Sequence, residues 1–156
     1  MESTKEARAD ELCELLRDFH PKKPRTFPRY DSTAGKWREI NEPALWPDQY
    51  VHHMIVQVLA PVLMRGMDFY CCGSIPGRGP HRARKAIEKW LEKDPKGTKY
   101  AAELDIKKFY PSLSPREVMR FLRRKIKDEA FLGLIWRIIK DGIKIGFYIS
   151  QWLANA

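Results

Sequence analysis

The sequence predicts an α+β protein that is rich in helix and poor in strand. Several stretches repeat apolar residues three and four positions apart, which is the period of an amphipathic helix. Only two short stretches, on either side of a Ser-Thr-Ala-Gly turn, are typical of a β-hairpin. With 156 residues, of which 44% are hydrophobic and 31% charged, the chain is long enough for one domain with a core, or for one domain and part of another.

A helix and then a hairpin are expected before residue 42. Residues 3–19 place Leu12, Leu15, Leu16 and Phe19 on one helical face, and a basic linker with two prolines follows as far as residue 25. The two strands are expected at 26–30 and 37–41. Pro28 indicates that the first of them is an edge strand.

The remainder is expected to be mainly helical around one central strand, at residues 99–105. A helix from Pro47 to about Gly66 should bury Val51, Met54, Ile55, Val58, Leu59 and Val62. A helix over 81–92 should bury Ala83, Ala86, Ile87, Trp90 and Leu91 and expose Arg82, Arg84, Lys85 and Lys89. A capping box at 114–117 should start the next helix, which buries Val118, Phe121, Leu122 and Ile126. Another helix should follow over 129–140.

The segment around Asp105 is the most informative part of the chain. This aspartate ends the expected strand and is followed by the aromatic pair Phe109 and Tyr110. A single aspartate at a strand end often only forms a turn. In a chain of net charge +9, however, it also suits a cation, and carboxylates that hold two Mg²⁺ ions serve phosphoryl transfer on nucleotides. Glu103 shares a strand face with Asp105 in this reading, although it is more simply a solvated charge.

Four segments, in this order along the chain, resemble the reverse transcriptases, in particular the bacterial and phage branch found in group II introns, retrons and diversity-generating retroelements. Residues 31–38 (DSTAGKWR) resemble the fingertip hairpin, and residues 73–81 (GSIPGRGPH) the glycine-rich fingers motif. Residues 105–113 (DIKKFYPSL) are similar to the first palm motif, and residues 145–152 (IGFYISQW) to the second. The resemblance therefore implies helix-rich fingers with a small antiparallel hairpin, followed by the first part of a polymerase palm.

The resemblance implies a role in metal binding or sugar selection for three residues of the first palm motif. Asp105 would be the catalytic carboxylate. Together with the backbone carbonyl of Ile106 and the aspartates of a later Tyr-x-Asp-Asp motif, it would hold two Mg²⁺ ions. Tyr110 would close the sugar pocket and exclude a ribose 2′-hydroxyl by its bulk. The alternative for Tyr110 is a core aromatic residue.

The resemblance also implies contacts with the incoming nucleotide and with the template. Arg38, with Arg29 and Lys36 beside it in the hairpin, would bind the triphosphate, because the planar guanidinium suits bidentate contact with phosphate. For Arg29 and Lys36 a solvated charge is an equal alternative. Gly146 would leave space beneath the nascent base pair. The template contacts would come from Gly77, Arg78, Ser150 and Gln151, although the glycine-rich segment can also be a plain tight turn. Lys144 stands where many members of the family have proline.

The expected domains are an N-terminal helix and linker (1–25), fingers (26–98) and a partial palm (99–156). The chain contains no Tyr-x-Asp-Asp motif, so we expect it to be inactive alone, to be part of a longer polymerase, and to self-associate through exposed apolar palm surface. The expected partners are an RNA template, a DNA primer and deoxynucleoside triphosphates, in the cytoplasm and without a membrane. Two alternatives remain: a non-catalytic nucleic-acid-binding module derived from a polymerase, and a structural subunit. The cysteine and histidine spacing does not favour a zinc site.

Overall fold

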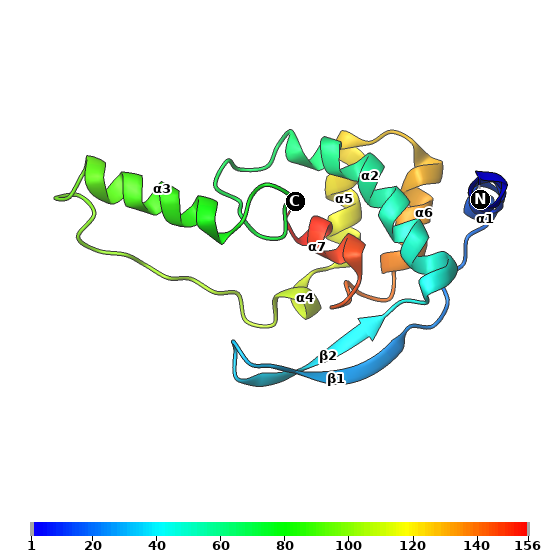
Figure 1. Ribbon diagram of the computed structural model, residues 1–156, viewed down its shortest axis with the longest axis horizontal. Coiled ribbons are helices and arrows are strands. Elements are labelled where there is room, and N and C mark those ends of the chain that lie inside the picture. Colours follow the sequence, from blue (N-terminus) through cyan, green and yellow to red (C-terminus); the bar gives the residue numbers. More distant parts are fainter. Residues whose placement is uncertain (1, 156) are drawn as a thin grey trace.

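Helices α2, α5, α6 and α7 surround the hydrophobic core of the α+β fold, and the two-stranded hairpin lies along one side of them (Figure 1). The computed structural model describes residues 2–155. Its elements are α1 (Glu2–Arg17), β1 (Arg25–Asp31), β2 (Lys36–Glu42), the π-helical turn η1 (Leu45–Gln49), α2 (Tyr50–Met64), α3 (Pro80–Lys93), α4 (Phe109–Ser112), α5 (Pro115–Lys125), α6 (Glu129–Ile139) and α7 (Tyr148–Ala154). The α+β prediction is confirmed.

The core is built from one apolar face of each packed helix. Fully buried side chains include Val51, Ile55, Leu59, Leu122, Leu132, Ile135 and Ile149. Helix α2 packs along α7, and α5 packs along α6. Phe19, which follows α1, is also buried, and its carbonyl accepts a hydrogen bond from Arg137 Nη1 at 3.3 Å. The N-terminal segment is thereby attached to α6.

The hairpin pairs β1 with β2 in antiparallel register, with Phe27 opposite Ile40 and Arg29 opposite Arg38. Each strand extends one residue beyond both ends of its predicted range, so the prediction of a hairpin is confirmed. Asp31 shapes the turn, because its Oδ1 accepts the backbone N–H groups of Thr33 and Ala34, each at 3.1 Å. Gly35 completes the turn with a positive φ of 61°, a conformation that favours glycine.

The predicted burial of α2 and α5 was partly wrong. In α2, Val58 is exposed, and the buried side chains include His52, Val56 and Leu63. These belong to the same helical face as Val51 and Ile55, so the stripe is rotated from the predicted one. In α5, Met119 and Leu122 are the buried residues, and the Ser114 side chain makes no capping hydrogen bond although Pro115 does begin the helix.

Helix α3 has the predicted extent, but the prediction that it buries an apolar face was wrong. None of its residues is buried, and Ile87, Trp90 and Leu91 are 51%, 44% and 48% exposed. Figure 1 shows why, since this helix extends away from the group formed by α2, α5 and α7. The loop before it packs against its side chains, with Tyr70 on Trp90 and Phe69 under Arg82.

The predicted central strand at 99–105 was also wrong. The segment has no regular secondary structure, and all its residues are exposed. In Figure 1 it runs as an open connection from α3 to α4. A β-strand requires a neighbouring strand to satisfy its backbone groups, and within residues 2–155 the only sheet is the β1–β2 hairpin, to which this segment does not pair. Across the same residues, no helix combines the length and apolar character that crossing a bilayer requires.

Candidate functional site

The hairpin touches the segment that resembles the second palm motif. The Asn41 N–H of β2 donates a hydrogen bond of 2.8 Å to the carbonyl oxygen of Ile145. The next residue, Gly146, has a φ of +104°, and a Cβ added there would collide with the Asn41 carbonyl oxygen and press on the Ile40 side chain. Gly146 is therefore needed twice, for its backbone conformation and for the close approach of β2.

A groove of about 320 Å³ opens where these segments meet. Its lining comes from the hairpin, the start of α2 and the N-terminal end of α7: Phe27, Arg29, Ile40, Asn41, Glu42, Pro43, Gln49, His52, His53, Gly146 and Tyr148. A second hollow of about 350 Å³ continues along the hairpin and shares Arg29 and Ile40 with the first; it adds Tyr30, Asp31, Ser32 and Arg38. Two segments more than a hundred positions apart in sequence thus form one concave surface.

The hairpin contributes charges of both signs to these two hollows, with Arg29 and Glu42 in the first and Arg29, Arg38 and Asp31 in the second. Arg29 and Arg38 lie directly opposite each other in the register, and like charges so placed repel. Asp31 offsets the repulsion in part, because its Oδ2 accepts a hydrogen bond of 2.6 Å from Arg38 Nε. This hydrogen bond, together with the Ala34 N–H, holds the pKa of Asp31 below its usual range.

Arg38 remains able to bind an anion in this arrangement. Its Nε is occupied by Asp31, whereas neither of its terminal nitrogens has a hydrogen-bond partner among residues 2–155. Two terminal nitrogens of one guanidinium form a fork that fits two oxygens of a phosphate. Asp31 fixes the side chain that carries this fork, and Arg29 adds a second positive charge across the hairpin.

Two histidines of α2 form the wall of the groove opposite the hairpin. The His52 ring lies 4.9 Å from that of Phe147, and the His53 ring stacks at 4.3 Å on Tyr148. His52 is 1% exposed, and neither ring nitrogen has a hydrogen-bond partner in the described part of the chain. Burial, with a smaller effect of His53, lowers the pKa of His52 to about 4, so its ring is neutral at pH 7.

This pair of histidines is the feature of the site that the sequence analysis missed. The signal available in sequence was the position of His52 between two core-facing residues of α2, Val51 and Ile55. The sequence does not indicate which side chains contact the consecutive aromatic residues Phe147 and Tyr148. The structure brings each of them to one of the histidines.

Asp105 and Ile106 lie apart from this groove, in the exposed connection before α4. The Asp105 carboxylate and the Ile106 carbonyl are oxygen donors of the kind that Mg²⁺ prefers, but Mg²⁺ requires near-octahedral coordination. No group of three or more histidine, cysteine or acidic residues able to hold a metal ion is found among residues 2–155. The described residues therefore do not by themselves fit a two-ion site.

Tyr110 lies in α4, which begins after Lys108 adopts a φ of +53°. Its ring is half-buried, packs against the core and lies 5.7 Å from the ring of Phe109 in an edge-to-face arrangement. Burial raises the pKa of the Tyr110 hydroxyl. The partly exposed position is compatible with both readings of this tyrosine, as a sugar gate and as a core residue.

The residues predicted to contact a template are dispersed. Gly77 has a φ of +72° in the turn before α3, and Arg78 Nη1 donates a hydrogen bond of 3.1 Å to the Asp68 carbonyl oxygen. Gln151 is exposed on α7. Ser150 is 1% exposed on α7, which packs along α2, and its contact with a template stays a prediction. Lys36 is exposed at the tip of the hairpin, opposite Asp31.

Comparison with known proteins finds a distant similarity. No family model matches the chain. Over 138 residues it is 26% identical to Protein YkfC of Escherichia coli (strain K12), in an alignment that covers 86% of this chain and 36% of YkfC. The chain thus corresponds to little more than a third of the length of that relative.

Proposed function

We propose that this chain forms the fingers and the first part of the palm of an RNA-directed DNA polymerase, and that the groove between the hairpin and the Gly146 segment receives the incoming deoxynucleoside triphosphate. The full polymerase would extend a DNA primer on an RNA template. The chain alone would bind the nucleotide and the nucleic acid without extending a primer, because it contains no Tyr-x-Asp-Asp motif.

The observation that carries the proposal is the contact between β2 and the Gly146 segment. Sequence resemblance alone assigned the triphosphate contacts to the hairpin and the base-pair floor to Gly146. The Asn41–Ile145 hydrogen bond and the shared groove bring these two elements together independently of that resemblance. The terminal nitrogens of Arg38, in the adjoining hollow, would hold the phosphates, and Gly146, by letting β2 approach, would keep the two walls of the groove together around the base and sugar.

Asp105 and Ile106 would contribute one carboxylate and one carbonyl to the magnesium site of the full polymerase, and the missing carboxylates would come from the later aspartates. When bound, the metal ions would supply charge stabilisation at the transferring phosphoryl group. In a polypeptide that contains all these parts, Asp105→Asn should abolish primer extension and leave template binding nearly unchanged. Tyr110→Ala should raise ribonucleotide incorporation relative to deoxynucleotide incorporation.

Photo-crosslinking tests the proposed nucleotide site on the 156-residue chain. An azido-deoxyadenosine triphosphate probe, irradiated with the protein and followed by peptide mapping, should label the hairpin and residues 145–148. An excess of unlabelled deoxynucleoside triphosphate should suppress this labelling. Labelling that is confined to α1 or α6, or that persists under competition, would reject the site.

A non-catalytic nucleic-acid-binding module is the second candidate. The observation in its favour is a second basic and aromatic hollow of about 480 Å³ beside α3, far along the chain from the hairpin. It is lined by Phe69, Tyr70, Gly77, His81, Arg82, Lys85, Ala86, Lys89 and Trp90. Such surfaces bind single strands by stacking and by charge. Nucleic-acid binding combined with no specific labelling by the nucleotide probe would favour this candidate.

A further inference from the structure

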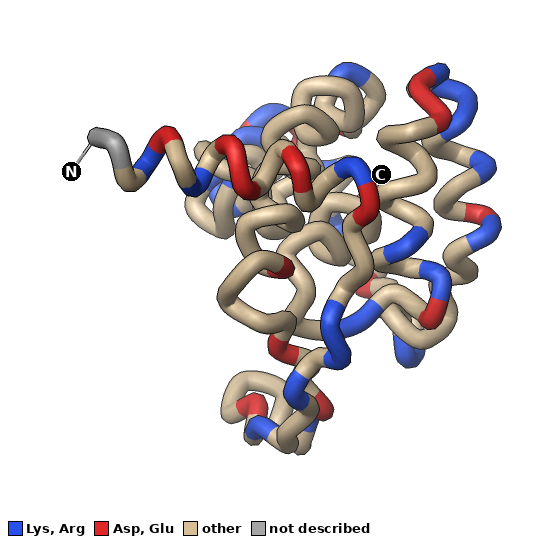
Figure 2. The backbone as a smooth tube through the Cα atoms, turned by 90° about the vertical axis from the view of Figure 1, so that its right-hand side faces the viewer, with Lys and Arg blue, Asp and Glu red and all other residues tan. Residues whose placement is uncertain are grey.

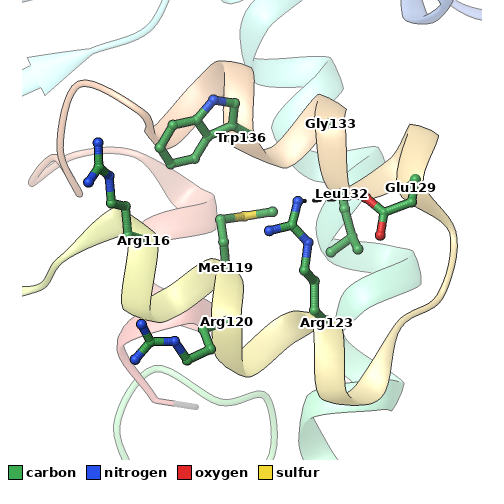
Figure 3. A pocket seen from close by; sticks show the side chains of 8 residues that line it. All are labelled: Arg116, Met119, Arg120, Arg123, Glu129, Leu132, Gly133 and Trp136. Carbon is green, nitrogen blue, oxygen red and sulfur yellow. Dashed lines mark ion pairs between the residues drawn. The ribbon is translucent and has the colours of Figure 1, made fainter.

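A groove of about 490 Å³ runs between α5 and α6. Figure 3 shows its lining, with Arg116, Arg120 and Arg123 projecting from α5 and Trp136 from α6. Met119 and Leu132 form the apolar floor, and Gly133 and Glu129 complete the α6 side. These residues belong to neither of the surfaces described above.

The three arginines follow one face of α5 at intervals of four and three residues. At a rise of about 1.5 Å per residue, the first and last are separated by roughly 10 Å along the helix. Arg120 pairs with Glu117 at 2.7 Å and Arg123 with Glu129 at 3.6 Å, while Arg116 has no ion-pair partner within residues 2–155. Both pairs are solvent-exposed, and exposed pairs contribute little, so phosphate oxygens can replace the carboxylates.

The α6 side of the groove offers space and an aromatic ring. Trp136 is 37% exposed beside the apolar floor, and a Cβ added to Gly133 would meet nothing within 4 Å. Gly133 is in the interior of α6, where glycine is less favourable than most residues. Its lack of a side chain keeps the groove open next to Trp136.

We propose that this groove binds a short segment of single-stranded nucleic acid, with a base stacked on Trp136 and successive phosphates on Arg116, Arg120 and Arg123. Aromatic rings combined with a basic track are the features by which proteins bind single strands without reading their sequence. An acidic peptide helix would need a longer apolar stripe than the two side chains of this floor provide. The site uses other elements than the proposed nucleotide groove, so it does not depend on the polymerase assignment.

Two matched double variants of the full chain test the charge contribution. The probe is a fluorescently labelled hexanucleotide, made as oligouridylate and as oligothymidylate, titrated from low to physiological salt. Arg120→Gln with Arg123→Gln should weaken binding about tenfold, and should make the dependence of log K on log salt shallower by roughly 1.4, the value for two phosphate contacts on a single strand. Arg124→Gln with Lys127→Gln removes the same charge from α5 and the residues that follow it, outside the groove, and should weaken binding less than twofold.

Filling the groove tests the stacking contribution without a change of charge. Gly133→Leu should abolish most of the binding while the melting temperature stays unchanged or rises, and ultraviolet crosslinking of the wild type should label the peptide that contains Trp136. Equal affinity of the ribo- and deoxy-oligomers is expected, because phosphates and base faces are common to both. Equal loss in the two charge variants, or full binding by folded Gly133→Leu, would overturn the proposal. The proposal would also be overturned if an octaglutamate peptide bound more strongly than the oligonucleotides and lost this binding in Gly133→Leu.

Discussion

Gly142 and Gly146 lie in the connection between α6 and α7, and comparing them separates the effect of backbone strain from that of tertiary contact. Both have a strongly positive φ, of 112° and 104° respectively. Around Gly142 an added Cβ would meet nothing within 4 Å, whereas at Gly146 it would collide with Asn41 and Ile40 of β2. The two positions share backbone strain but differ in tertiary contact.

Gly146→Ala should therefore destabilise the protein more than Gly142→Ala. We expect Gly142→Ala to lower the unfolding free energy by about 1 kcal/mol from backbone strain alone, and Gly146→Ala by about 2–4 kcal/mol through the added collision with β2. Urea denaturation of both variants measures the difference. Equal destabilisation would mean that the hairpin does not press on Gly146 in solution.

His52 predicts a pH dependence of stability. In the unfolded chain its pKa is about 6.5, and burial lowers the pKa to about 4 in the folded state. Between pH 4 and pH 6.5 the unfolded state binds more protons than the folded state. The unfolding free energy therefore decreases as the pH falls from 6.5 towards 4. The full effect is at most about 3 kcal/mol.

Comparing the wild type with His52→Leu isolates this effect, because contributions from other titrating groups are common to both proteins. The difference in unfolding free energy should shrink or reverse in favour of the variant as the pH is lowered from 7 to 4. His53→Leu, which changes the exposed neighbouring ring, is the control and should retain the wild-type slope. A His52→Leu protein with an unchanged slope would show that His52 is solvated or hydrogen-bonded.

Among the elements, α3 shows most clearly what sequence periodicity predicts. The apolar spacing of Ile87, Trp90 and Leu91 correctly predicted a helix, but periodicity does not say which surface covers the apolar face. Within residues 2–155 no neighbouring element buries it. The same limit explains why the strand predicted at residues 99–105 does not form. Local sequence can favour an extended chain, but a strand exists only beside a partner strand.

Hydrogen exchange should reveal this difference between elements. An isolated helix of this length is marginal in water, and few tertiary contacts hold α3. We expect the amides of α3 to exchange at least a hundredfold faster than those in the middle of α2, which is anchored by Ile55 and Leu59. Comparable protection in α3 and α2 would indicate that another surface, such as a second copy of the chain, covers α3.

At the scale of the whole molecule, the net charge of +9 predicts nonspecific attraction to nucleic acid. Figure 2 shows lysine and arginine on several sides of the molecule, including the connection from α1 down to the hairpin. If about four phosphates of an RNA–DNA hybrid are neutralised, log K should fall with log salt at a slope of roughly −3.6. Titration across a salt series measures this slope; a flat response would favour the structural-subunit reading.

The sequence was a good guide to the helices, the hairpin and the fold class, because these depend on local periodicity and turn chemistry. It was a poor guide to which distant segments of the chain contact one another. The pairing of His52 with Phe147, the inward orientation of Ser150 and the exposure of Asp105 all depend on how distant segments pack. No spacing rule within the chain predicts the approach of β2 to Gly146.

Titration with a fluorescent deoxynucleoside triphosphate tests the central claim, that the hairpin and the Gly146 segment form a nucleotide site, most directly. Arg38→Gln should weaken binding about tenfold or more, since a charge-assisted hydrogen bond to phosphate is worth about 1.5–3 kcal/mol. Arg124→Gln, which removes the same charge from α5, should change the affinity less than twofold. Equal affinities of the two variants at constant salt would contradict the account, because the triphosphate would then sense only the overall charge of the molecule.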